Sequence, residues 1–361
     1  MSAERRALWI GTYTPGSDPG GAGEGIHLVW LDPATGALTG GGVAARTDGP
    51  SFLARHPGGH LLYAVNERAE GGLTGFAVGA DGALRELGTV PTGGSSPCHL
   101  AVHPAGRHVI VANYADGGVA VHPIAENGAP RVACALLTHT GGGPDAARQA
   151  GPHAHHVSVA PGGRHLFVCD LGTDELRRHP LDAAPTDSRI VGPGGGTPVA
   201  ARLPAGTGPR HLAAHPTGHL YISGELDSRV HVLRWDGAAA TAVPLVAVPA
   251  TTTPDAAAGP NHPAELALSP DATRLYVANR GADTIAAFEV GPDGADLRPI
   301  AEVATGGARP RHFALVDGAF LVVANQGSGD LTVLRLDPAT GIPQATGHRL
   351  ELPDPVCVLP V

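Results

Sequence analysis

The sequence contains no lysine, so all 24 of its basic residues are arginines. This absence excludes Schiff-base chemistry on a lysine amine and the lysine of a phosphate-binding loop. The net charge is −9 and no basic run occurs anywhere in the chain. Nucleic acid is therefore not an expected partner, because phosphate binding needs a concentrated cationic face.

Long apolar segments are also missing. No stretch approaches the 18 apolar residues that a membrane-spanning helix requires, and MSAERRALWIGTYTPG at the start lacks the apolar run of a signal peptide. The four cysteines are widely scattered and lack the spacing of a metal site: Cys98, Cys134, Cys169 and Cys357. We expect reduced core thiols in a cytoplasmic protein with no membrane partner.

What the chain has in excess is glycine and proline, 52 and 34 of its 361 residues, whereas aromatic residues make up only 4%. This composition indicates many short strands joined by turns, around a core of small residues. One strand pattern recurs seven times: LWIGT, LLYAVN, HVIVAN, HLFVCD, HLYISG, RLYVAN and FLVVAN. The strand ends lie 46 to 57 residues apart, which is the period of a repeat architecture.

Each recurring strand is followed by a polar turn and a second apolar strand, and six are preceded by a strand that ends at a turn such as HPGG or HPAG. Three strands and a looser fourth make one propeller blade, so residues 1–361 predict a single all-β domain, a seven-bladed β-propeller. The first repeat lacks a leading strand, and we expect residues 355–361 to supply it and close the ring. A β-sandwich lacks a fifty-residue period, and a doubly wound fold needs helical periodicity that the chain does not show.

Two columns of polar residues follow from the repeat, because the start of an inner strand and the end of its antiparallel neighbour lie at the same face of the disc. The first column holds Ser51, Phe52, Cys98, His99, His155, His156, Arg210, His211, Ala264, Glu265, Arg311 and His312. The second holds Glu67, Tyr114, Leu171, Glu225, Arg280 and Gln326. Side chains alternate along a strand, so we expect one residue of each adjacent pair to face the channel and the other to pack between blades.

The residue types at this mouth suggest a site for a small anion. The expected cup contains three arginines, Arg210, Arg280 and Arg311, together with Glu225 and His155. Guanidinium groups can bind carboxylate or phosphate there. The alternative for each arginine is an ion pair between blades. His153 and His155 are spaced to share a strand face as metal ligands, but no third ligand is evident. We therefore expect no metal, with most of the histidines hydrogen-bonded at strand starts.

Several stretches together resemble a known family. GTGPRHLAAHP, LYISGELDSRVHVL, LYVANRGADTIAAF and PRHFAL, with IGTYT and PHAHH, are similar to the seven-bladed propeller lactonases, the bacterial propeller-type 6-phosphogluconolactonase family, which is related in fold to carboxy-cis,cis-muconate lactonising enzymes. The resemblance covers essentially the full chain. It implies that His155, Arg210, Glu225 and Arg280 match the family's proposed active-site residues, whereas a one-residue shortening after Arg311 departs from the repeat.

The resemblance implies a metal-independent lactonase without a cofactor that hydrolyses a small anionic lactone, 6-phosphogluconolactone to 6-phosphogluconate in the pentose phosphate pathway. We expect His155 as general base with Glu225 orienting it or acting as the base itself, and Arg210 and Arg280 holding the phosphate or the oxyanion. The expected substrate-binding residues are Arg311, His211, Glu265, His99 and Glu67.

Other readings of the sequence stay open. A carboxy-cis,cis-muconate cyclase would use the same cup, and a non-catalytic propeller could bind a protein partner over its rim. No G-x-S-x-G or H-E-x-x-H motif is present, which argues against serine-nucleophile and zinc-protease mechanisms. We expect a monomer or homodimer, in which the loops at about 190–209 and 247–263 are passive connectors.

Overall fold

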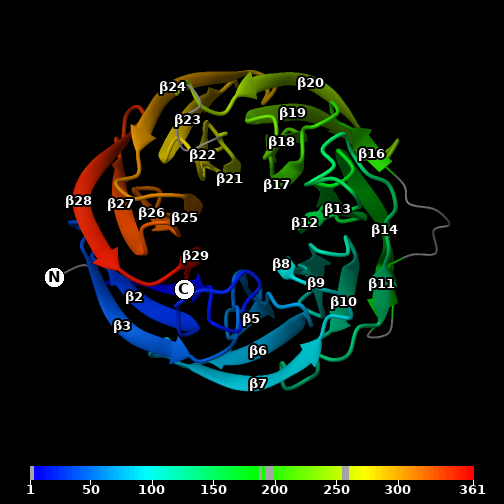
Figure 1. Cartoon of the computed structure of the whole chain (residues 1–361), viewed down its shortest axis with the longest axis horizontal. Helices are drawn as coiled ribbons and strands as arrows, with labels where there is room; N and C mark the ends of the chain where they lie inside the picture. The colour runs from blue at the N-terminus through cyan, green and yellow to red at the C-terminus, as the bar shows by residue number, and fades with distance from the viewer. Residues whose placement is uncertain (1–3, 187–188, 192–198, 254–259) are drawn as a thin grey trace.

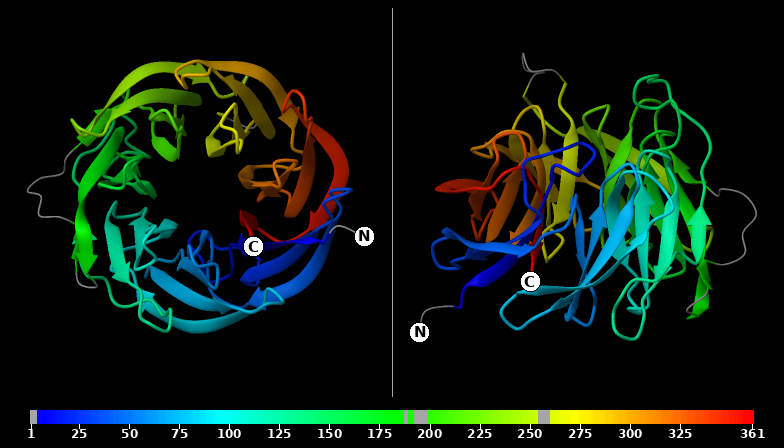
Figure 2. Two further views of the ribbon diagram at one scale, coloured as in Figure 1. Left: turned by 180° about the vertical axis from the view of Figure 1, so that it is seen from behind. Right: turned by 60° about the horizontal axis from the view of Figure 1, so that its bottom comes forward.

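Seven antiparallel sheets stand in a ring around a central axis in the computed structural model, which describes residues 4–186, 189–191, 199–253 and 260–361 (Figure 1). Seen from both faces, each sheet runs outward from the axis as one propeller blade (Figure 2). The predicted seven-bladed β-propeller is confirmed. No helix in the described part of the chain is long and apolar enough to cross a membrane.

The inner two strands of each blade set the position of the site. The innermost strands are β29 (Pro355–Pro360), β4 (Leu53–Arg55), β8 (Pro97–Val102), β12 (Ala154–Val159), β17 (Pro209–Ala214), β21 (Pro263–Leu268) and β25 (Pro310–Val316). The second strands are β1 (Arg6–Thr12), β5 (Leu61–Asn66), β9 (His108–Asn113), β13 (His165–Asp170), β18 (His219–Gly224), β22 (Arg274–Asn279) and β26 (Phe320–Asn325).

The outer two strands of each blade widen the disc. The third strands are β2 (Ile26–Leu31), β6 (Gly72–Val78), β10 (Val119–Pro123), β14 (Glu175–Thr186), β19 (Arg229–Asp236), β23 (Thr284–Val290) and β27 (Asp330–Leu336). The outer strands are β3 (Leu38–Ala45), β7 (Leu84–Pro91), β11 (Ala135–Leu137), β20 (Thr241–Pro249), β24 (Leu297–Ala304) and β28 (Pro343–Glu351). In the fourth blade β15 (Arg189–Val191) and β16 (Val199–Arg202) both pair with β14.

The C-terminal strand closes the ring as predicted. Strand β29 pairs antiparallel with β1, with Ile10 opposite Val358, so the first blade joins both ends of the described chain. Leu8 and Ile10 of β1 then pack against Val322 of β26 in the last blade. This pairing covers two sheet edges that would otherwise stay open.

The core lies between neighbouring blades. Each blade is covered on its two faces by its two neighbours, so the second strands β5, β9, β18 and β26 are buried along their whole length. Outer strands such as β20 are mostly exposed or half-buried instead. The core is therefore divided into clusters that fill the gaps between adjacent sheets.

Turn chemistry explains part of the histidine content. The Nδ1 atoms of His56, His103 and His215 accept backbone N–H groups two residues further on, at 2.9, 3.2 and 3.2 Å. The glycines that complete these turns have positive φ, for example 77° at Gly59 and 68° at Gly106, a conformation that side chains with a Cβ disfavour. These histidines organise the inner-strand turns and lie outside the candidate site.

Candidate active site

A β-bulge recurs at the start of the inner strands and decides which side chains reach the axis. In β8 the register shifts between Pro97 and His99, and in β12 it shifts between Ala154 and His156. Strands β17, β21 and β25 carry the same irregularity. A bulge inserts a residue that has no partner on the neighbouring strand, so the alternation of side chains is broken there.

The bulges create two layers of polar side chains. His155 contributes to a pocket at one mouth of the ring, whereas His156 lies beside His99 and His211, with ring centroids 4.2 and 5.5 Å away. The prediction that only one of each adjacent pair faces the channel is therefore wrong for His155 and His156. A period of two holds only for a strand without a bulge.

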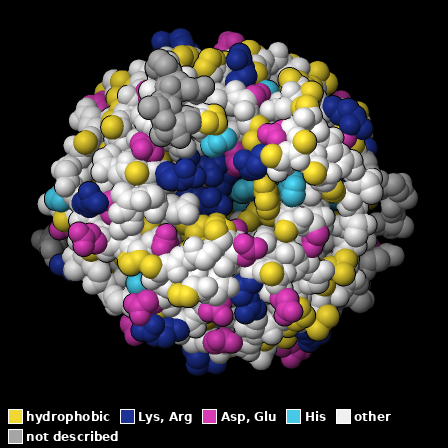
Figure 3. All heavy atoms as spheres, viewed as in Figure 1, with side chains coloured by type: hydrophobic (Ala, Val, Ile, Leu, Met, Phe, Trp, Pro, Cys, Tyr) yellow, Lys and Arg dark blue, Asp and Glu magenta, His cyan; other side chains and the backbone are white. Residues whose placement is uncertain are grey.

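The upper layer is the set of side chains that line the pocket reached by His155, which has a volume of about 350 Å³. Its walls are Asp18, Pro19, Glu67, Ser96, Cys98, Tyr114, Ala115, Arg148, His155, Glu225, Arg280 and Arg311. Figure 3 shows arginine side chains, in dark blue, gathered in the hollow at the middle of the disc. A small polar molecule fits a pocket of this size, and the arginines favour a negatively charged one.

Glu225 forms ion pairs with three arginines at this pocket. Its carboxylate lies 2.6 Å from Arg148 Nη2, 2.6 Å from Arg280 Nη2 and 2.9 Å from Arg210 Nε. Burial raises the pKa of Glu225, but Arg280 and Arg210 outweigh it and hold the pKa well below its ordinary value. Glu225 therefore stays ionised and fixes the arginines, and it is a poor proton acceptor.

The arginines differ in how deeply they are buried. Burial lowers the pKa of Arg280 to about 9 although Glu225 opposes this. Burial also lowers the pKa of Arg148, whose side chain is 35% exposed, but the charge and hydrogen bonds of Glu225 and Tyr114 together outweigh it, so this pKa is raised. Arg210 is almost wholly buried, and its Nη1 has no hydrogen-bond partner in the described chain. Arg148 thus stands at the rim of the pocket.

Glu67 is another acidic group of the pocket, and its surroundings differ from those of Glu225. Its carboxylate accepts hydrogen bonds from the hydroxyls of Tyr13, at 3.1 Å, and Ser51, and within the described residues no arginine forms an ion pair with it. Burial raises the pKa of Glu67 to about 7, against a smaller opposing effect of Arg311. Arg311 lies over the Tyr13 ring, with Cζ 5.3 Å from its centroid. Glu67 is thus poised to exchange a proton near neutral pH.

His155 faces the same pocket as a neutral imidazole. Burial, followed by Arg210 and His211, lowers the pKa of His155 well below its ordinary value. Its Nδ1 has no hydrogen-bond partner in the described structure, and its ring lies 5.5 Å from that of Tyr114. His153, the other half of the considered metal pair, stacks on Tyr114 and bonds its carbonyl oxygen at 2.8 Å.

The lower layer, which consists of His156 and the residues packed around it, contains residues that we expected to bind substrate. His99, His211 and Glu265 do not line the pocket; His211 Nδ1 lies 2.8 Å from Glu265 Oε2, and His312 Nε2 lies 3.3 Å from the same oxygen. Phe52 packs on His99, with ring centroids 4.1 Å apart. The structure thus brings together Glu67, His155, Glu225, Arg280 and Arg311 at the pocket wall, with Arg210 directly behind.

Arg311 reaches the pocket despite the shortened repeat. Strand β25 has the same bulge between Pro310 and His312 as the other inner strands, so Arg311 occupies the position equivalent to His155. The missing residue is absorbed in the following turn, where Asp317 and Gly318 both have positive φ. Of the loops that we expected to be passive, residues 192–198 and 254–259 lie outside the described residues.

Comparison with known proteins gives the family. The family model described as lactonase, 7-bladed β-propeller, matches residues 7–360. The chain belongs to this lactonase family. Among its lactonase relatives, the 6-phosphogluconolactonase of Bacillus subtilis is 32% identical over 97% of both chains.

Solved structures agree with this placement in the lactonase family. The periplasmic gluconolactonase of Pseudomonas aeruginosa is 29% identical, with a TM-score of 0.88 over 99% of both chains. A Bacteroides fragilis protein superposes with a TM-score of 0.90 at 29% identity, and covers 100% of this chain and 99% of its own. The resemblance identified in the sequence is confirmed, and it extends over the whole ring.

Proposed function

We propose that the protein hydrolyses a phosphorylated sugar-acid lactone, 6-phosphogluconolactone, to 6-phosphogluconate, a reaction of the pentose phosphate pathway. The observation that carries this proposal is the group of four arginines at the pocket, Arg148, Arg210, Arg280 and Arg311, which outnumber its three carboxylates, Asp18, Glu67 and Glu225. A cationic surplus in a polar pocket suits a phosphate-bearing substrate. The name of the Bacillus subtilis relative supports the same substrate.

The reaction needs a base, a group that stabilises the oxyanion and a grip on the phosphate. Water attacks the lactone carbonyl carbon, the bond from that carbon to the ring oxygen breaks, and the proton taken from water passes to the departing ring oxygen. No metal ion takes part in this scheme, because arginines can stabilise the negative charge that develops on the carbonyl oxygen.

We assign the base to Glu67. It lines the pocket, it is buried, and its carboxylate is held by two hydroxyl groups instead of by an arginine. Glu225 is committed to its arginines, and the neutral imidazole of His155 is a weak proton acceptor. This assignment differs from our expectation for His155, which we place beside the departing ring oxygen as a hydrogen-bond donor.

The arginines divide between the two ends of the substrate. Arg311 lies next to Tyr13 and hence to Glu67, so it is suited to stabilise the oxyanion that forms as Glu67 takes the proton. Arg148 and Arg280 hold opposite oxygens of Glu225 and leave other N–H groups for the phosphate. Arg210, behind Glu225, positions that carboxylate.

The test is the initial rate of hydrolysis of freshly generated 6-phosphogluconolactone, in EDTA, above its spontaneous rate. We expect a clear excess rate for the wild type and a loss of at least about 100-fold in kcat/KM for Arg280→Ala, because the variant lacks a buried charged group that holds the phosphate. Arg298→Ala is the matched control, because Arg298 is exposed on β24 and its one ion pair among the described residues is with Glu289 at the surface. An absent excess rate, or a fully active Arg280→Ala that folds normally, would overturn the proposal.

A further inference from the structure

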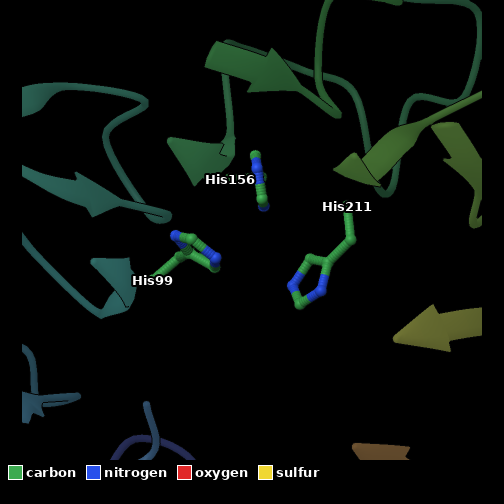
Figure 4. Close-up of side chains that lie close together, drawn as sticks. All are labelled: His99, His156 and His211. Atoms are coloured by element: carbon green, nitrogen blue, oxygen red, sulfur yellow. The ribbon is translucent and has the colours of Figure 1, made fainter. Parts of the chain in front are cut away.

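Three histidines of the lower layer converge at the axis of the ring. His99, His156 and His211 come from β8, β12 and β17, the innermost strands of three successive blades, and each is more than 90% buried. Their nearest ring nitrogens all lie within 4.8 Å of one another. Figure 4 shows the three rings facing a common centre.

The ring nitrogens at this centre are available as ligands. His211 directs Nδ1 at Glu265, which fixes the proton on that nitrogen and leaves the lone pair of Nε2 free. Neither His211 Nε2 nor either ring nitrogen of His156 has a hydrogen-bond partner in the described part of the structure. Buried polar atoms normally have partners, so these unpartnered nitrogens are open to a ligand.

Glu265 gives the cluster the second feature of a metal centre. A histidine ligand commonly donates its other ring N–H to a carboxylate, which orients the imidazole and makes it a better ligand. Glu265 accepts from His211 at 2.8 Å, and His312 Nε2 lies 3.3 Å from the same oxygen, so the carboxylate is itself held in place.

His99 is the weakest of the three ligands. Its Nδ1 accepts a long hydrogen bond, 3.3 Å, from the backbone N–H of Val157, so a metal ion bound at Nε2 would break that bond and turn the ring. A zinc ion with Zn–N distances of about 2.0–2.1 Å needs nitrogens about 3.3 Å apart, so the cluster must also contract by side-chain rotation. Both changes are local, because only the imidazoles need to move.

We propose that His99, His156 and His211 bind one divalent transition-metal ion of the zinc type, with Glu265 orienting His211. Imidazole nitrogens suit Zn²⁺, Co²⁺ and Ni²⁺, and three protein ligands leave a fourth position open toward the axis. The ion would tie the third, fourth and fifth blades together below the pocket. It is separate from the proposed hydrolysis, whose groups lie in the upper layer.

The test uses untagged full-length protein, stripped with EDTA and freed of it, titrated with Zn²⁺ by calorimetry and with Co²⁺ by visible absorption. We expect one tight equivalent, a tetrahedral-type Co²⁺ spectrum, and a higher Tm with Zn²⁺. His156→Gln and His211→Gln should lose these signals, whereas His60→Gln, at an exposed turn position, should keep them.

Glu265→Gln keeps all three ligands and should weaken Zn²⁺ binding about 10- to 100-fold, as expected for loss of a carboxylate that orients a histidine ligand. Weak or non-stoichiometric binding by the wild type would overturn the proposal, as would unchanged binding by the folded His211→Gln protein. Hydrolysis is not a readout here, so the outcome is independent of the proposed lactonase activity.

Discussion

Replacing Glu67 with Gln tests the assignment of the base, because the pKa of Glu67 is raised whereas that of Glu225 is lowered. With a pKa of about 7, about a tenth of Glu67 is ionised at pH 6 and about nine tenths at pH 8. If Glu67 is the base, kcat/KM should rise about tenfold over this range. Glu67→Gln should abolish the rise and most of the rate.

The raised pKa of Glu67 also predicts that the stability of the protein depends on pH. The pKa of Glu67 is raised from 4.5 to about 7 in the folded chain, so folding is penalised wherever the unfolded carboxyl is ionised. The penalty is absent below pH 4.5, grows as the pH rises, and reaches about 3 kcal/mol above pH 7. Glu67→Gln should therefore be more stable than the wild type at pH 8, by an amount on the order of 3 kcal/mol that vanishes at pH 4.

Initial rates corrected for spontaneous hydrolysis, and urea unfolding at pH 4 and pH 8, measure both effects. If the wild-type kcat/KM is flat from pH 6 to pH 8, Glu67 is not the base, and His155 becomes the better candidate because its pKa lies well below this range. A stability difference that does not depend on pH would show that the pKa of Glu67 is not raised by burial in the folded protein.

Two further predictions concern the groups around Glu225 and Glu67. Glu225→Gln leaves its three arginine partners without their counter-charge, so urea unfolding should show a free energy of unfolding lower by about 3–5 kcal/mol. Glu289→Gln at the surface should leave the free energy of unfolding unchanged, and equal stability of the two variants would refute the anchoring role of Glu225. Tyr13→Phe removes a hydroxyl that stabilises the ionised form of Glu67, so the midpoint of the pH–rate profile should move upward, and a downward shift would contradict the hydrogen bond between them.

The ring could be predicted from the sequence because its period is written in the strands themselves. The seven strand ends from Thr12 to Asn325 mark the blades, and the missing first inner strand identifies the closing role of Pro355–Pro360. The positions of Glu67, Glu225 and Arg280 also follow, since each comes just after a second strand and hence at one mouth. Regular repetition makes these positions comparable between blades.

The division into two layers could not be predicted in the same way. It depends on bulges that let the side chains of both His155 and His156 reach the axis, and a bulge leaves no mark in the alternation of residue types. Arg148 was missed because it lies in an irregular loop between β11 and β12, where the repeat gives no register. The raised pKa of Glu67 likewise depends on its burial, and the hydroxyls that oppose this effect come from Tyr13 and Ser51, which are distant in sequence.

We propose that the arginines around Glu225 hold a phosphorylated lactone. The decisive measurement is kcat/KM for 6-phosphogluconolactone and for unphosphorylated gluconolactone, in the wild type and in Arg280→Ala. We expect the wild type to prefer the phosphorylated substrate strongly, by at least about 100-fold, and this preference to fall sharply in Arg280→Ala. Equal kcat/KM values for the two lactones, or a preference that Arg280→Ala leaves intact, would contradict it.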